Sequence, residues 1–179
     1  MKVYTRKGDD GSTDLLYGGR VSKNDSQPEV YGDVDETQAF IGLARAAAGE
    51  ELSTLLMKIE RELWTLMAEL ACNPEKIGNL DENSRVTKEM VEGLEDVIDE
   101  LSEKFEMPKE FVVPGEDEVS ARLDVARTVC RRAERSAVGL ALENSHVVPY
   151  LNRLSDLLWS AARWHEGESV TTNSVPASE

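Results

Sequence analysis

Residues 122–135 read Arg-Leu-Asp-Val-Ala-Arg-Thr-Val-Cys-Arg-Arg-Ala-Glu-Arg and hold five of the chain's twelve arginines. Around this segment, apolar residues recur at steps of four and three, the period of a buried helical stripe: Val119, Leu123, Ala126, Cys130, Ala133, Ala137 and Leu140. At ~100° per residue, one flank beside the stripe collects charged side chains: Asp124, Arg127, Arg131, Glu134 and Arg135. The segment therefore predicts an amphipathic helix over about 116–144 with a guanidinium-rich flank.

This flank favours a small, highly charged phosphate ligand. Arginine on a half-buried flank is costly unless it is paired or faces a polyanion. Local pairs at i,i+3 and i,i+4, such as Asp124 with Arg127, explain part of the cluster. Arg131 and Arg135 add positive charge beyond the neighbouring carboxylates. The formal net charge of −15 at pH 7 makes nucleic acid and anionic membranes poor partners for the whole chain.

The rest of the chain predicts an all-α, five-helix bundle, whose arginine flank is most easily buried at a subunit interface. The five helices are expected over about 33–48, 51–72, 87–107, 116–144 and 149–166. Asp33-Val-Asp-Glu36 has the pattern of a capping box and opens the first of them. Residues 1–32 are rich in glycine and lack a helical period, so irregular structure is expected there. We expect one domain over 1–166 and a disordered tail over 167–179.

Composition points to a cytoplasmic protein. No apolar run approaches the ~18 residues that a membrane span needs, and the N-terminus has no signal-peptide core. Cys72 and Cys130 lie on apolar helical stripes and are expected to be reduced core thiols. His146 and His165 are isolated, and neither forms the helical Glu-x-x-His pair of a di-metal bundle.

Two glycine-rich segments near the N-terminus are candidates for a phosphate cradle. Thr5-Arg-Lys-Gly-Asp-Asp-Gly-Ser-Thr13 combines glycines with basic and hydroxyl side chains, and Gly18-Gly-Arg-Val-Ser-Lys23 is similar. Glycines let backbone N–H groups approach an anion closely, and hydroxyls and cations complete the cradle. A solvated turn is the alternative interpretation of each segment.

Two further positions have both a structural and a functional interpretation. Asn152 lies near a helix start, where it is either a cap or an amide that reads an adenine or ribose edge. At ~100° per residue it shares a flank with Asp156 and Arg163. Phe111, in a loop before Pro114-Gly115, is either a core residue or hydrophobic latch, or a stacking wall for a flat cofactor.

Six segments, taken in order over residues 3–166, resemble one family: the PduO-type ATP:cob(I)alamin adenosyltransferases, also called corrinoid adenosyltransferases. The last two segments are long and specific. The six read Tyr-Thr-Arg-Lys-Gly-Asp-Asp-Gly (4–11), Gly-Gly-Arg-Val-Ser-Lys (18–23), Tyr-Gly-Asp-Val-Asp-Glu (31–36), Phe-Val-Val-Pro-Gly (111–115), Val-Ala-Arg-Thr-Val-Cys-Arg-Arg-Ala-Glu-Arg (125–135) and Tyr-Leu-Asn-Arg-Leu-Ser-Asp (150–156).

The resemblance implies a homotrimer with active sites between subunits. ATP and Mg²⁺ would bind where the N-terminal loop of one subunit meets the arginine-rich helix of its neighbour, and cobalamin would be the second substrate. The implied nucleotide-binding residues are Thr5, Arg6, Lys7, Gly8, Thr13, Asp14 and Lys23 in the N-terminal segment, and Arg131, Arg132, Ala133, Glu134, Arg135 and Asn152 in the helices. The pattern names no residue as a metal ligand.

The resemblance also implies how the reaction is catalysed. Co(I) attacks the 5′ carbon of ATP and triphosphate leaves, so the implied catalytic work is positioning and charge neutralisation, in which Arg131 faces ATP. Asp35 would pair with Arg127 across the interface, and Phe111 would close the lower axial face of the corrinoid. A flavin-dependent reductase and an adenosylcobalamin-dependent enzyme are the implied protein partners.

Some positions depart from the family pattern, and two other functions stay open. Pro-Gly-Glu-Asp (114–117) replaces the common Pro-Gly-Gly, Gln38 replaces an asparagine, and Asp124 stands where histidine is frequent. The altered loop favours a carrier that binds ATP or adenosylcobalamin without turnover. A purely structural helical oligomer is the third possibility, but it leaves the basic, glycine-rich N-terminus without an explanation.

Overall fold

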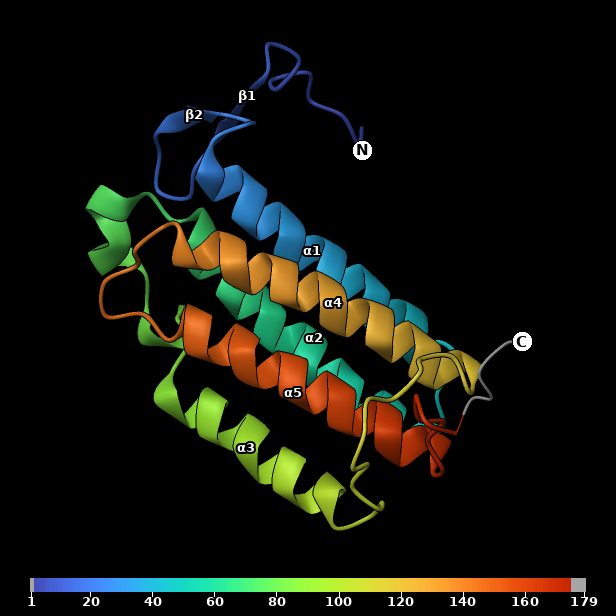
Figure 1. Ribbon diagram of the computed structural model, residues 1–179. Coiled ribbons are helices and arrows are strands. Elements are labelled where there is room, and N and C mark those ends of the chain that lie inside the picture. Colours follow the sequence, from blue (N-terminus) through green and yellow to red (C-terminus); the bar gives the residue numbers. More distant parts are fainter. Residues whose placement is uncertain (1, 175–179) are drawn as a thin grey trace.

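The computed structural model describes residues 2–174, and within this range the chain is a helical bundle with one small hairpin (Figure 1). The predicted all-α fold is confirmed. The elements are β1 (Ser12–Asp14), β2 (Arg20–Ser22), α1 (Ser26–Arg45), α2 (Glu50–Ala71), the 3-10 segments η1 (Pro74–Asn79) and η2 (Glu82–Ser84), α3 (Lys88–Ser102), α4 (Glu118–Val138) and α5 (Val147–Glu166).

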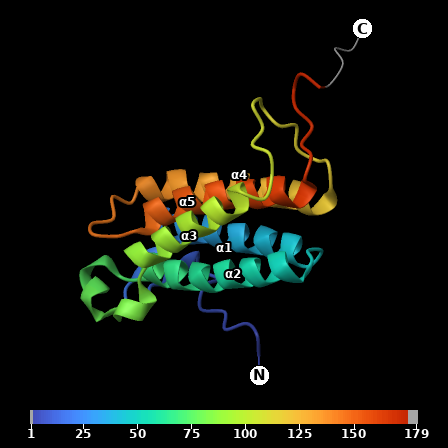
Figure 2. The same cartoon turned by 90° about the horizontal axis from the view of Figure 1, so that it is seen from below.

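Helices α1, α2, α4 and α5 surround most of the core, and α3 packs against α5 from outside. α4 packs against α1 and α5, α2 against α1, and α3 against α5 (Figures 1 and 2). α1 and α4 are antiparallel, because Arg132 of α4 reaches Asp33 while Arg122 donates to the Leu43 carbonyl. The seams predicted from the leucine periodicity are buried, and Leu56, Leu63 and Leu123 have no exposed area.

The predicted start of the first helix was wrong, because α1 begins about two turns earlier, at Ser26. Pro28, which interrupts the helical pattern in the sequence, lies in the first turn, where its missing N–H leaves no hydrogen bond unmade. Asp33 is therefore inside the helix and not its cap. Its carboxylate accepts from Arg132 Nε (3.0 Å) and Ser136 Oγ (2.9 Å).

α4 is shorter than predicted at its C-terminal end. Its start is close to the predicted one, where the Asp117 carboxylate accepts from the Val119 and Ser120 amides in a capping box. The helix ends at Val138, and Ala141 and Asn144 have φ angles of 47° and 51°. A positive φ is incompatible with a right-handed helix, so residues 139–146 form a loop.

The N-terminal segment, predicted to be irregular, contains a short antiparallel hairpin in which Thr13 faces Val21. The hairpin is attached to the C-terminal end of α2. The Leu16 amide donates to the Ala71 carbonyl (2.8 Å), and the Asn73 amide donates to the Leu16 carbonyl (3.1 Å). Asn73 Nδ2 also donates to the Gly18 carbonyl (2.7 Å), so the hairpin has a fixed place at one end of the bundle.

Two other predictions concern the C-terminal half. α3 ends at Ser102, before Pro108, and Phe105 lies beyond it, where its ring and that of Trp159 meet in an edge-to-face arrangement. Residues 167–174, part of the tail predicted to be disordered, form hydrogen bonds with residues 110–113. Residues 175–179 lie outside the described residues, so the prediction is untested for them.

The predictions for the cysteines and for membrane association can also be compared with the structure. Cys72 and Cys130 are buried and free, as expected. Burial raises the pKa of the Cys130 thiol well above its ordinary value. Among the residues that the structure describes, none of the helices has the length and apolarity needed to cross a bilayer.

Candidate functional site

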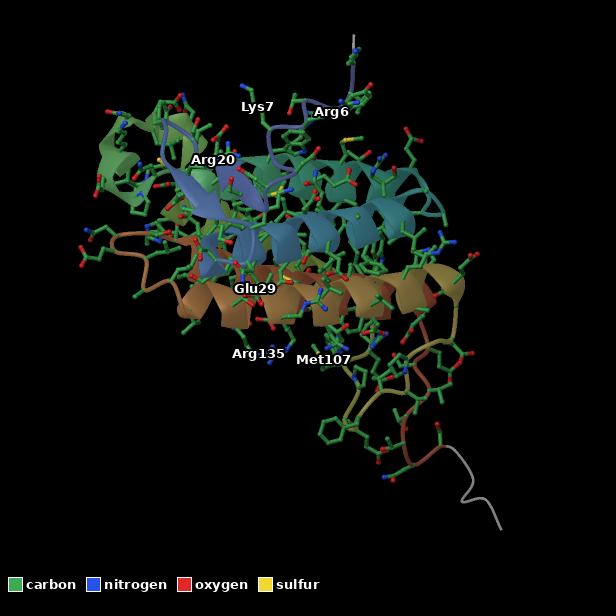
Figure 3. All side chains as sticks on the ribbon, turned by 90° about the horizontal axis from the view of Figure 1, so that it is seen from above. Arg6, Lys7, Arg20, Glu29, Met107 and Arg135 are labelled. Atoms are coloured by element: carbon green, nitrogen blue, oxygen red, sulfur yellow. The ribbon has the colours of Figure 1, made fainter. Side chains whose placement is uncertain are left out.

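Two arginines on the outer face of α4 have no partner in the described part of the chain. Arg131 and Arg135 are exposed and form no ion pair within residues 2–174. They are one turn apart, so their side chains emerge from the same face, and Figure 3 shows Arg135 projecting away from the bundle. This is the surplus of positive charge that the sequence predicted, and it leaves two guanidinium groups available to an anion.

The other three arginines of α4 are paired inside the subunit. Arg132 contacts Asp33 (3.0 Å) and Glu36 of α1. Arg127 Nε donates to Asp124 Oδ1 (2.9 Å), while Arg122 pairs with Glu118 and donates to a carbonyl of α1. Arg132, expected beside the nucleotide, therefore joins α4 to α1. Ala133, from the same predicted set, has its side chain in the core with no exposed area.

A buried ionic network fixes α4 against α5. Arg163 is 1% exposed, and its Nη2 donates to Asp124 Oδ2 at 2.8 Å. Arg163 Nε lies 2.8 Å from Glu166 Oε1, and its guanidinium lies over the Trp159 ring. Asp124 thus contacts two guanidinium groups, which satisfies a carboxylate that would otherwise be costly to bury.

Asn152 lies between α4 and α5, where its amide contacts charged side chains. Its Nδ2 donates to Glu134 Oε1 (2.8 Å), and its Oδ1 accepts from Arg153 (2.5 Å). α5 begins at Val147, so the capping interpretation of Asn152 was wrong and His146 occupies the cap. The structure therefore brings together two predicted nucleotide contacts, Asn152 and Glu134, on the face that also carries Arg131.

Arg20 organises the N-terminal loop. Its guanidinium donates to Ser12 Oγ (2.6 Å), to Asp14 (3.1 Å) and to Asp10 (3.1 Å), and it also binds the Lys7 carbonyl. The hydrogen bond from the Ser12 hydroxyl is the largest cause of a lowered Asp10 pKa, about 2, to which Arg20 also contributes. Sequence reasoning missed Arg20. The available signal was its place after the glycine pair in a short hairpin, opposite Asp14.

This arrangement leaves Arg6, Lys7 and Lys23 without an ion-pair partner among the described residues. The Arg6 guanidinium lies over the Tyr4 ring (5.4 Å), and the Thr5 hydroxyl accepts from the Lys7 amide (3.4 Å). Thr5, Arg6, Lys7 and Lys23 are exposed, and Arg6 has a φ of 63°. Lys23 lies against Gly8, where an added Cβ would stand 2.9 Å from the ammonium nitrogen. Thr13 is half-buried within β1, whereas Asp14 is paired with Arg20. Gly8 and Lys23 are therefore close together, as a common phosphate site requires.

The two basic regions do not meet within one chain. Figure 3 shows Arg6 and Lys7 on one side of the bundle and Arg135 on the opposite side. Asp35 is exposed and forms no ion pair in the described range, and Arg127 pairs with Asp124 instead of Asp35. A ligand that touched both regions would need a second copy of the chain.

Phe111 lies in the loop before α4, with its side chain 86% exposed. The latch interpretation is not supported in the single chain, because the ring does not pack in the core. Arg131 lies about 20 Å along α4 from the first residue of that helix. The Phe111 loop and the arginine pair thus lie toward opposite ends of α4.

The bundle carries two exposed basic regions, which give a helical protein with surfaces suited in charge to a polyanion. The chain belongs to the cobalamin adenosyltransferase family, which it matches over residues 3–165. It is 39% identical to the corrinoid adenosyltransferase PduO of Salmonella typhimurium over 98% of this chain but only 53% of that protein. It is 40% identical to the corrinoid adenosyltransferase of Bacillus subtilis, over 91% of this chain and 86% of the relative.

The chain is also similar to solved structures of PduO-type ATP:corrinoid adenosyltransferases. A PduO-type ATP:corrinoid adenosyltransferase from Lactobacillus reuteri, with alanine in place of a phenylalanine and complexed with cobalamin and ATP, superposes with a TM-score of 0.87. It is 29% identical, over 95% of this chain and 98% of that one. A variant with lysine in place of an arginine, complexed with ATP, has a TM-score of 0.85 at 29% identity, over 94% of this chain and 99% of that one.

Proposed function

We propose that this chain transfers the 5′-deoxyadenosyl group of ATP to cob(I)alamin, forming adenosylcobalamin and releasing triphosphate. The observation that carries this proposal is the pair of unpartnered guanidinium groups, Arg131 and Arg135, on a helix otherwise paired within the subunit. They stand on a fold whose curated relatives are named for this transfer and whose solved relatives hold both substrates.

The chemistry needs positioning and charge neutralisation more than proton transfer. The cobalt electron pair of Co(I) forms a bond to C5′ of ATP, the C5′–O bond breaks, and its electrons leave with triphosphate. Guanidinium groups suit this leaving group because they form charge-assisted, bidentate hydrogen bonds with phosphate oxygens. Held in place beforehand, they stabilise the charge that develops as the bond breaks. The local positive charge also offsets the repulsion that an acidic protein exerts on ATP.

We place the active site between subunits of a homotrimer. The support is the separation of Lys7 from Arg135 in one chain (Figure 3). In addition, α4 has an exposed stripe whose members follow the helical period and include apolar residues: Val125, Thr128, Arg131, Arg135 and Val138. Exposed apolar residues grouped with polar ones on one helix face are typical of an interaction surface. The exposed Asp35 of one subunit would then reach the free terminal nitrogens of Arg127 in the next.

Mg²⁺ would enter this site with ATP. Residues 2–174 hold no cluster of three or more metal-binding side chains. Mg²⁺ in nucleotide sites keeps several waters and is bound largely through substrate phosphates, so it does not require such a cluster. In one chain, Asp10 and Asp14 are engaged by Arg20. When bound, the ion would neutralise triphosphate charge, while Thr5, Lys7 and Lys23 orient the phosphates.

Phe111 would exclude the lower axial ligand of the corrinoid. Removing that ligand withdraws electron donation to cobalt, so Co(II) is more easily reduced by one electron from a reductant such as a reduced flavin. The ring is 86% exposed in the single chain, which leaves it accessible to a flat macrocycle. A flavin-dependent reductase and a downstream adenosylcobalamin-dependent enzyme are therefore the proposed protein partners. The cytoplasm is the proposed location.

The carrier alternative was favoured by the Pro-Gly-Glu-Asp segment, and the structure gives part of that segment a different explanation. Asp117 caps α4 through hydrogen bonds to two backbone amides. A residue that begins the helix does not by itself impair turnover. The intact, unpaired Arg131 also favours the transferase over a carrier.

The direct test is an anaerobic assay of the purified chain with chemically reduced cob(I)alamin, ATP and Mg²⁺. Loss of the Co(I) absorbance, with an equal amount of triphosphate released, would establish the transferase. Thermal stabilisation by ATP without turnover would support the carrier instead, since ligand at ~100 times its dissociation constant adds ~2.7 kcal/mol. A purely structural oligomer would show neither.

A further inference from the structure

The segment after α5 forms a strand-like pairing with the loop that carries Phe111. The Val113 amide donates to the Val170 carbonyl (2.8 Å), and the Thr172 amide donates to the Phe111 carbonyl (2.9 Å). Val112 and Thr171 are antiparallel partners. Figures 1 and 2 both show the C-terminal segment lying beside the loop that precedes α4. This segment, residues 168–174, is called the strap below.

The strap is fixed at both ends. At its start, Gly167 has a φ of 75°, which turns the chain away from α5, and its amide donates to the Arg163 carbonyl (3.1 Å). At its far end, Asn173 Nδ2 donates to Glu110 Oε1 (2.6 Å). His165 Nδ1 lies 3.2 Å from Asp117, which joins the last turn of α5 to the other end of the same loop.

The pairing determines where the Phe111 side chain points. Successive side chains of an extended segment face opposite sides. Phe111 and Val113 are accordingly 86% and 38% exposed, whereas Val112 between them is half-buried. The loop between α3 and α4 has no regular structure of its own beyond this bridge, so the hydrogen bonds to the strap are what fix its extended backbone.

We propose that the strap positions Phe111 for the reaction, through the Thr172 amide. This inference rests on the proposed function, because it assigns Phe111 the lower face of the corrinoid. Thr172 is a positioning residue: it touches the Phe111 backbone and not the reacting atoms. Its loss should therefore harm the step that depends on the Phe111 ring, the one-electron reduction of Co(II), more than alkyl transfer from Co(I).

A pair of variants at one position tests this. Thr172→Pro removes the amide donor, whereas Thr172→Ala removes the side chain and keeps the amide. We expect Thr172→Pro to slow adenosylation that starts from Co(II) with reduced flavin by ~10-fold or more, since small misplacements near the reacting centre have effects of this size or larger. Adenosylation from pre-reduced Co(I) should change less than ~2-fold, because that reaction does not depend on excluding the lower ligand. Thr172→Ala should resemble the wild type in both assays.

A second variant and a structural readout guard against misfolding. Asn173→Ala, which loses only the Glu110 contact, should shift the Co(II) rate in the same direction by a smaller factor. Hydrogen exchange of the Val113 amide should be faster in Thr172→Pro than in Thr172→Ala, with unchanged melting of the bundle. Equal rates for the two Thr172 variants, or equal slowing of both reactions, would overturn the strap proposal. A wild-type protein inactive even with Co(I) would instead refute the proposed function.

Discussion

Arg163 Nη2 lies 2.8 Å from Asp124 Oδ2, and only 1% and 5% of the two side chains are exposed. Asp124→Ala would leave Arg163 with Glu166 alone and would release Arg127. Breaking a buried pair by removing one partner typically costs ~3–5 kcal/mol, so we expect a loss of free energy of unfolding of that order. Urea unfolding at fixed protein concentration measures it, because association adds to apparent stability.

Arg163→Met combined with Glu166→Gln, in the Asp124→Ala background, is the control for that experiment. The two changes remove both charges of the buried Arg163–Glu166 pair that the single variant leaves behind, so they should recover part of the lost stability. A triple variant less stable than Asp124→Ala would show that Arg163 stabilises the fold by other contacts, such as its stacking on Trp159.

The second prediction concerns Arg131, one of the two arginines on α4 that have no ion-pair partner in the described residues. Arg131→Ala should lower kcat/KM for ATP by ~100-fold or more, as expected for a donor that stabilises leaving-group charge. The melting temperature should hardly change, because Arg131 is exposed and has no ion-pair partner within residues 2–174. Steady-state kinetics with thermal melting of the same preparation provide both measurements.

Arg122→Ala is the matched control on the same helix. Arg122 pairs with Glu118 and a carbonyl of α1 and lies about two and a half turns from Arg131, so its removal should cost little activity and only ~0–1 kcal/mol of stability. If the two variants lose activity equally, the effect comes from net charge and not from the place of Arg131.

The helix seams were predictable because burial of a leucine stripe leaves a periodic record in the sequence. Leu56, Leu63 and Leu123 are examples, each without exposed area. The start of α1 could not be predicted in this way. In a sequence, a proline in the first helical turn looks the same as a proline that breaks a helix, and only the hydrogen bonds distinguish them. The surplus charge of Arg131 was visible, since it could be counted against nearby carboxylates.

The rest of the site depends on contacts between distant residues. The organising role of Arg20 follows from a hairpin of three-residue strands, which is too short to give a clear alternating pattern. The bridge between Val112 and Thr171 joins a short apolar stretch, residues 111–113, to a polar segment, and both are too short to show a period. Its stability comes from backbone hydrogen bonds, which every residue except proline can donate, so the sequence does not specify which two segments pair.

The third prediction tests the close approach of Gly8 and Lys23. A Cβ at Gly8 would lie 2.9 Å from Lys23 Nζ and 3.2 Å from the Ser12 carbonyl oxygen. Gly8→Ala should therefore push the Lys23 ammonium aside without unfolding the bundle. Loss of one charge-assisted contact to phosphate, ~1.5 kcal/mol, would raise the KM for ATP by ~10-fold.

Gly32→Ala is the control for this experiment, because an added Cβ at Gly32 meets no atom within 4 Å. Gly32 lies within α1, where alanine is the better helix former, so stability should rise slightly while the KM stays the same. An unchanged KM in Gly8→Ala would remove Lys23 from the proposed phosphate site.

The fourth prediction concerns the exposed ring itself. Phe111→Ala should slow adenosylation from Co(II) more than adenosylation from pre-reduced Co(I), because only the first requires the lower ligand to be excluded. The ring is 86% exposed in the single chain, so its loss should leave thermal stability nearly unchanged. The same fractional slowing in both assays would mean that Phe111 only packs against the corrinoid.

The last prediction is a pH dependence of stability at Asp117. Burial opposes ionisation of this carboxyl, but hydrogen bonds from Ser120, His165 and Val119 outweigh it and hold its pKa below the ordinary 3.8. A lowered folded-state pKa gives stability that is fully present above the unfolded pKa and is lost as pH falls through the folded one. Wild type should therefore exceed Asp117→Asn in free energy of unfolding by a constant amount above about pH 5, and the difference should shrink below about pH 4.

Denaturant unfolding of both proteins from neutral to acidic pH measures this difference. His165→Asn should be measured in the same way, because the imidazole is the other possible source of the effect. Its Nδ1 lies 3.2 Å from the same carboxylate. If the cap to the Val119 and Ser120 amides is the main source, the acid loss persists in the His165→Asn background. A difference that vanishes with the imidazole would assign the effect to the ion pair, which joins α5 to the Phe111 loop, and not to the cap of α4.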